Sequence, residues 1–166
     1  MTTEAASTTV QVHRVYIRAS PQAVWDAITT PEWNERYGYG GVSEYDLHPG
    51  GAYRALADEG MKAMGVADVI VDGEVLEADP PHKLVQTWRI LMTGADPVPA
   101  ATVLTYEIVA TPTGLTKLTV VHDVSAAPEL GPMVAGNIEG AGGGWPWILS
   151  DLKSLIETGE PIGWTG

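Results

Sequence analysis

The chain of 166 residues contains no cysteine, which excludes disulfide bonds and thiolate metal sites. Such an absence is typical of a protein that works in a reducing compartment. The first nine residues have neither the basic nor the apolar region of a secretory signal. No stretch approaches the roughly 18 consecutive apolar residues of a membrane span. We therefore expect a cytoplasmic protein that does not enter the membrane.

Basic residues are also scarce: nine Lys and Arg stand against 21 Asp and Glu, for a net charge of −12. A surface this acidic repels the phosphate backbone of nucleic acids, whose affinity for proteins comes mainly from Lys and Arg. It is repelled by anionic membrane surfaces for the same reason. Neutral or cationic small molecules, or proteins with a basic face, remain as partners.

Phenylalanine is absent too, whereas the chain has six Trp and six Tyr. Every larger aromatic ring therefore carries an N–H or O–H group that needs a partner when it is buried. Ordinary core packing explains this composition, and so does a cavity lined by rings that can form hydrogen bonds. With 45% apolar and 18% charged residues, the chain has the composition and length of one globular domain.

The order of local patterns predicts an antiparallel sheet followed by a helix. Strands are expected where β-branched residues lie between turn signals, at 9–18, 42–47, 52–56, 66–78, 83–92, 102–110 and 115–123. Ser20-Pro21 and Thr30-Pro31 are start signals for two short helices after the first strand. His48-Pro-Gly-Gly51 predicts a type II turn. The segments 57–65 and 93–101 are expected to be longer loops, which often surround a binding site.

The last third of the chain has the period of a helix. An apolar stripe runs through Trp145, Ile148, Leu149, Leu152, Leu155 and Ile156, and a similar stripe spans residues 130–141. Gly140, Gly142, Gly143 and Gly144 lie between them, so we expect one kinked helix or two pieces. The glycines either let the helix bend or let a ligand approach the backbone. Trp147 falls on the side opposite the stripe, which predicts that it is exposed or at a subunit contact.

Four segments carry a family resemblance. They are ASPQAVWDAITTPE at 19–32, HPGG at 48–51, VLEADPP at 75–81 with LVQTW at 84–88, and GW…L…L…ETG at 144–159. In this order the chain resembles the family of activator of heat-shock-protein-90 ATPase homologue-like proteins. This family is a branch of the START-type, polyketide-cyclase-like (SRPBCC) superfamily. The resemblance covers residues 9–160 and implies the α+β helix-grip fold, a curved sheet of six or seven strands around a long C-terminal helix.

The same resemblance implies one domain at 9–160, between a flexible N-terminus at 1–8 and a tail at 161–166. The co-chaperone that gave the family its name carries a further N-terminal domain, for which this chain has no room. We therefore expect a protein that holds a hydrophobic, aromatic or polycyclic molecule between sheet and helix, for sequestration, transport or resistance. A cofactor-independent cyclase, dehydratase or hydrolase is the alternative, and a protein-interaction domain, including a homodimer, is the third hypothesis.

The candidate lining combines aromatic rings with adaptable methionines. It consists of Trp33, Tyr37, Tyr53, Met61, Met64, Trp88, Met92, Met133, Asn137 and Trp145. The alternative explanation for each residue is ordinary packing in the core. We expect no cofactor and no metal site, since the four histidines are isolated from one another in sequence.

His122 is the one candidate acid or base. It alternates with Leu118 and Val120 on a strand and is expected to point inward. Such a histidine is either a hydrogen-bonded core group or, if a substrate comes within reach, a general base.

Overall fold

The computed structural model describes residues 9–39, 41–91, 98–139 and 142–163. Its centre is a seven-stranded antiparallel sheet in the order β1-β7-β6-β5-β4-β3-β2. The strands are β1 (Val10–Ile17), β2 (Val42–Tyr45), β3 (Ala52–Leu56), β4 (Val69–Asp79), β5 (Lys83–Ile90), β6 (Thr102–Ala110) and β7 (Thr116–Asp123). Each strand from β2 to β6 pairs with the next strand along the chain, and β7 also pairs with β1. The predicted meander is confirmed.

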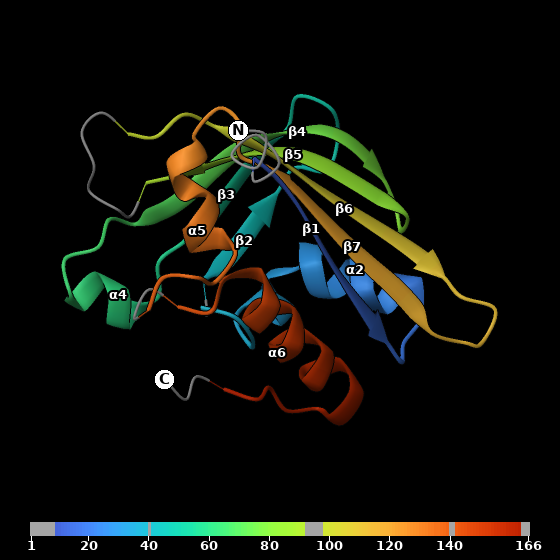
Figure 1. Ribbon diagram of the computed structural model, residues 1–166. Helices are drawn as coiled ribbons and strands as arrows, with labels where there is room; N and C mark the ends of the chain where they lie inside the picture. The colour runs from blue at the N-terminus through green and yellow to red at the C-terminus, as the bar shows by residue number, and fades with distance from the viewer. Residues whose placement is uncertain (1–8, 40, 92–97, 140–141, 164–166) are drawn as a thin grey trace.

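The helices gather on one side of this sheet, which arches over α6 and α2 in Figure 1. They are α2 (Pro21–Thr29), α3 (Pro31–Asn34), α4 (Glu59–Ala63), the 3-10 turn η1 (Pro128–Leu130), α5 (Gly131–Val134) and α6 (Gly144–Thr158). The α+β helix-grip prediction is therefore confirmed. None of these helices combines the length and apolar content that a membrane span requires.

Local signals fix the helix start and the first turn as expected. The Ser20 side chain accepts a hydrogen bond from the Ala23 amide (3.1 Å), and Pro21 occupies the first helical turn. In the β2–β3 turn Gly50 has φ +90° and the Gly51 amide donates to the His48 carbonyl (2.8 Å). That is the positive φ a type II turn requires at this position.

Two irregular positions help the sheet to curve. The register shifts between Ala55 and Leu56 on β3, and between Val75 and Glu77 on β4. A bulge bends its strand and increases the local twist. The sheet can therefore close on α6 at the β1–β7 side and stand away from it at the β3–β4 side. The main core joins Ile17, Leu118 and Val120 of the sheet to Val24 of α2 and Leu152 of α6.

The C-terminal helical region is two pieces, which decides between the two predicted arrangements. The upstream piece is much shorter than its stripe, because α5 ends at Val134 and Gly136 turns the chain at φ +80°. Gly144, at φ +61°, begins α6 in contact with that turn: a Cβ there would lie 2.4 Å from the Gly136 nitrogen. These two glycines let two parts of the same backbone meet. The close approach of a ligand to this backbone stays a prediction.

Candidate functional site

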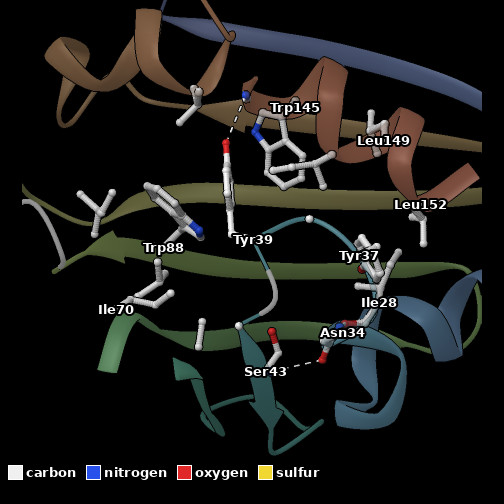
Figure 2. A pocket seen from close by; sticks show the side chains of 18 of the residues that line it. Ile28, Asn34, Tyr37, Tyr39, Ser43, Ile70, Trp88, Trp145, Leu149 and Leu152 are labelled. Carbon is white, nitrogen blue, oxygen red and sulfur yellow. Dashed lines mark hydrogen bonds between the residues drawn. The ribbon is translucent and has the colours of Figure 1, made fainter. Parts of the chain in front are cut away.

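A cavity of about 380 Å³ lies between the sheet and α6. The strands β2 to β7 and the helices α2 to α6 contribute to it, and none of the described side chains in its wall carries a formal charge. The helical wall is formed by Trp145, Ile148, Leu149 and Leu152 of α6, with Met133 and Val134 of α5. The sheet wall is formed by Tyr53, Ala55, Ile70, Val71, Trp88, Ile90, Tyr106 and Leu118. Figure 2 shows Trp145, Leu149 and Leu152 descending from α6 on one side, and Trp88 and Ile70 on the other.

Asn34 closes one end of the cavity and belongs to the fold rather than to an open polar site. Its amide nitrogen donates to the carbonyls of Ala27 (3.2 Å) and Ile28 (2.9 Å). Its amide oxygen accepts from the Ser43 amide (3.2 Å, Figure 2). These three bonds tie the end of α2 to β2. They occupy both the amide nitrogen and the amide oxygen of Asn34.

Three tyrosines of the wall, Tyr37, Tyr53 and Tyr106, are neutral groups. Burial raises the pKa of Tyr53 to about 12, and it raises the pKa values of Tyr37 and Tyr106 above the ordinary value as well. Loss of water disfavours the charged phenolate, so each ring keeps its proton at physiological pH. The Tyr37 hydroxyl donates to the Ala27 carbonyl (3.0 Å). These residues therefore present O–H groups and do not act as bases.

His122 lies behind the aromatic wall, fully buried, and points inward as expected. The Trp145 indole N–H donates to its Nδ1 (3.1 Å), because an indole can only donate. The Thr102 hydroxyl donates to the Trp88 carbonyl (2.9 Å), so it accepts the remaining proton from His122 Nε2 (2.8 Å). This arrangement defines a neutral imidazole with Nε2 protonated. Burial, with His13 nearby, lowers the pKa of His122 to about 4.

Tyr39 lies at the rim of the cavity, between the α3–β2 connection and the start of α6 (Figure 2). Its hydroxyl accepts a hydrogen bond from the Gly144 amide (3.3 Å), and its ring packs on Trp147 with centroids 5.1 Å apart. The Trp147 indole N–H donates to the Gly163 carbonyl (3.4 Å). Trp147 was expected to be exposed or at a subunit contact. Trp147 is half-buried, so it is not fully exposed, and the subunit contact stays a prediction.

Comparison with known families decides the identity of the fold. Residues 18–157 match the family described as Activator of Hsp90 ATPase homolog 1-like protein. The chain belongs to this family. No curated protein sequence matches it significantly.

Solved structures of similar fold extend the comparison of this Hsp90-activator-homologue-like chain. Protein MLL2253 of Mesorhizobium loti has a TM-score of 0.62 at 24% identity, with 89% of this chain and 96% of that chain covered. DynU16, described as a putative protein in the dynemicin biosynthetic locus, gives 0.68 at 20% identity, over 94% of this chain and 50% of its own. The Hsp90 activator PFC0360w of Plasmodium falciparum gives 0.54 at 20% identity, over 93% and 91%. At these identities the likeness is one of fold.

Within this family member, the cavity wall brings together six of the ten residues predicted to line it. They are Tyr37, Tyr53, Met61, Trp88, Met133 and Trp145. Their role in binding a ligand stays a prediction. His122 lies one layer behind them, with both ring nitrogens already bonded.

Three of the other predicted residues do not line the cavity, and the fourth lies outside the described residues. Trp33 packs at the edge of the core, with the Arg36 guanidinium 4.9 Å from its ring, because the next residue, Asn34, takes the inward position. Met64 follows α4 and is 79% exposed. Asn137 is exposed because α5 ends before it. Met92 lies outside the described residues.

The prediction missed four polar residues of the wall: Asn34, Tyr39, Ser43 and Tyr106. For Tyr106 a signal was present, since it alternates with Leu104 and Ile108 on the predicted strand 102–110. Asn34 and Tyr39 lie where no strand or helix period extends far enough to show which way a side chain points.

Proposed function

We propose that this chain binds a hydrophobic, aromatic or polycyclic small molecule between the sheet and α6, in sequestration, transport or resistance. The observation that carries the proposal is a mostly apolar wall, with six aromatic residues and no charged side chain among the described residues, around about 380 Å³ in a domain of this size. Protein interiors are normally packed to the density of organic crystals, and internal space reduces stability. The volume falls within the range of small-molecule pockets, about 300–1,000 Å³.

The alternative, a cofactor-independent cyclase, dehydratase or hydrolase, needs a base or acid that can reach a bound substrate. His122 is shielded by Trp145 and Thr102, and its pKa is depressed to about 4. Tyr37, Tyr53 and Tyr106 of the wall have raised pKa values. These contacts favour binding over catalysis. The third hypothesis, a protein-interaction domain, has less support, because Trp147 is half-buried and packs on Tyr39.

A cavity-filling variant tests the proposal. Ala55 lies in the wall on β3 and is 8% exposed, so Ala55→Phe places a ring inside the cavity. With the neutral tricyclic hydrocarbon fluorene as probe, we expect binding to the wild type. We expect at least about tenfold weaker binding to Ala55→Phe, roughly 1.4 kcal/mol, measured by fluorescence titration.

The matched control is Ala110→Phe, at the exposed end of β6 and outside the cavity wall. It should keep the wild-type affinity. Thermal unfolding of each variant reports whether it folds. Equal affinities of Ala55→Phe and the wild type, with Ala55→Phe folded, would show that fluorene binds elsewhere and would contradict the proposal.

A further inference from the structure

Several polar groups of the cavity wall are already bonded within the fold. Asn34 and Tyr37 bond to carbonyls of α2, and the Trp145 N–H is taken by His122. Among the residues that the structure describes, the Trp88 indole N–H and the Tyr106 hydroxyl form no hydrogen bond; their recorded contacts are ring contacts.

Both unpaired groups reach open space. Among the described residues, no side-chain nitrogen or oxygen that is fully buried lacks a hydrogen-bond partner. Trp88 and Tyr106 are only partly buried, and both lie in the cavity wall. The cavity therefore gives access to the Trp88 nitrogen and the Tyr106 oxygen. Figure 2 shows the Trp88 ring at one end of the cavity, with its nitrogen on the side toward Tyr39.

The sheet register separates these two groups. Trp88 on β5 pairs with Thr102 on β6, and Tyr106 lies four residues further along β6, opposite Leu84. At about 3.3 Å per residue, their backbones are about 13 Å apart along the strands. A row of rings fills the interval: Trp88 to His122 (5.1 Å between centroids), His122 to Trp145 (6.1 Å) and Trp145 to Tyr106 (6.1 Å). Two hydrogen-bond donors thus stand at the two ends of one aromatic wall.

The chemistry of these groups selects the kind of polar atom that a ligand can bring. An indole N–H only donates, and burial keeps the Tyr106 hydroxyl protonated. A ligand carbonyl oxygen can pair with either group, whereas a ligand N–H could pair only with the Tyr106 oxygen. The described residues of the wall include no charged side chain that could pair with a charged ligand group, and a buried polar group without a partner weakens binding.

We propose that the ligand is an uncharged polycyclic ketone or quinone, whose carbonyl oxygen accepts a hydrogen bond from Trp88 or Tyr106. A ligand with an oxygen at each end uses both donors. This inference rests on the proposed function, because it names the chemical class bound at the same site. The hydrocarbon rings fill the apolar part of the cavity, and the two donors select the position of the oxygen.

Fluorenone and fluorene test the inference, since they share one tricyclic skeleton and differ by a carbonyl. Water solvates the carbonyl, so a wall with no donor would favour fluorene. We expect the wild type to bind fluorenone more tightly by about tenfold, the effect of one hydrogen bond. The double variant Trp88→Phe/Tyr106→Phe should lower this ratio of dissociation constants to about one. The carbonyl stretching band of fluorenone should move to lower frequency on binding to the wild type only.

The ratio of the two affinities cancels the loss of ring volume, which affects both probes. Tyr37→Phe is the matched control: it also removes a hydroxyl from the wall, but one already bonded to Ala27, so the ratio should stay at the wild-type value. Trp33→Phe controls for loss of an indole outside the wall. A wild-type ratio near one, or a ratio that the double variant leaves unchanged, overturns the inference while fluorene binding still supports the proposed function. Failure of both probes to bind overturns the two together.

Discussion

At the scale of single residues, His122 shows how a buried polar group is held in one protonation state. Trp145 can only donate to it, and Thr102 accepts from it while donating to the Trp88 carbonyl. Every donor in this series has one acceptor. The series orients the Trp145 ring, which forms part of the cavity wall, and it joins β5, β6, β7 and α6. Protonation of His122 would put a second N–H opposite that of Trp145.

The depressed pKa of His122 predicts a stability change in mild acid. The ordinary value of 6.5 applies to the unfolded chain, and burial lowers the folded pKa to about 4. Between these values the unfolded state binds a proton that the folded state does not. Stability is therefore complete above about pH 6.5 and falls as the pH drops toward 4, by about 3 kcal/mol in total. Urea unfolding at a series of pH values measures this loss.

The control for this measurement is His122→Gln, which offers an amide in place of the imidazole and does not titrate. We expect it to be less stable than the wild type at pH 7.5, but to lose less free energy of unfolding between pH 6.5 and pH 4. Other groups, including the nearby Asp123 and His13, titrate in both proteins. Parallel pH profiles for the two proteins would rule out His122 as the source of the loss.

At the scale of elements, local signals were sufficient wherever a period or a cap extended over several residues. The Ser20-Pro21 helix start, the Gly50 turn and the inward face of β7 all follow from neighbouring residues. Apart from the methyl group of Ala141, the glycine segment 140–144 has no side chain whose polarity could predict its contacts. Its described part meets Gly136 and Tyr39, which lie outside the segment, and only the folded chain brings them together.

The cavity wall also contains residues that a local period places and residues that only tertiary contacts place. Tyr53, Trp88 and Trp145 were predicted because their strands and helix fix which side they face. In the four-residue helix α3 a shift of one position separates Trp33 from Asn34, and the sequence favoured the larger apolar ring. What placed Asn34 inward was the need of the Ala27 and Ile28 carbonyls for a donor at the end of α2. That need is a property of the packed elements.

The junction of α5 and α6 gives a prediction for Gly144. An alanine there would keep a positive φ of 61° and place its Cβ 2.5 Å from the Val134 carbonyl oxygen. We expect Gly144→Ala to lower the free energy of unfolding by about 3 kcal/mol or more, since backbone strain and overpacking add. Gly114→Ala is the matched control: its φ is +88°, but nothing lies within 4 Å of the added atom. It should cost only about 1–2 kcal/mol. Equal losses in urea unfolding would show that the α5–α6 contact can relax.

At the scale of the whole molecule, two properties combine to select the charge of a ligand. The chain carries a net charge of −12, and the part of the cavity wall that the structure describes contains no charged side chain. The first property acts at a distance and is screened by salt, over about 8 Å at physiological ionic strength. The second acts only after entry, because an ion that leaves water needs a partner inside. An anionic ligand is opposed by both.

The carboxylate of fluorenone-2-carboxylic acid and its methyl ester separate these two effects. At pH 7 the ester is neutral, so we expect it to bind, and we expect the carboxylate to bind at least about a hundredfold more weakly, roughly 2.7 kcal/mol. Raising the salt concentration to about 1 M shortens the screening length to about 3 Å and should recover only a small part of the difference. The part that remains is the cost of removing the carboxylate from water.

If high salt restored the full affinity, the net charge alone would exclude anions and the wall would have no part in selecting charge. If the carboxylate bound as tightly as the ester at low salt, its charge would have to stay in solvent at the rim beside Tyr39, and the polar end of the ligand would point out of the cavity.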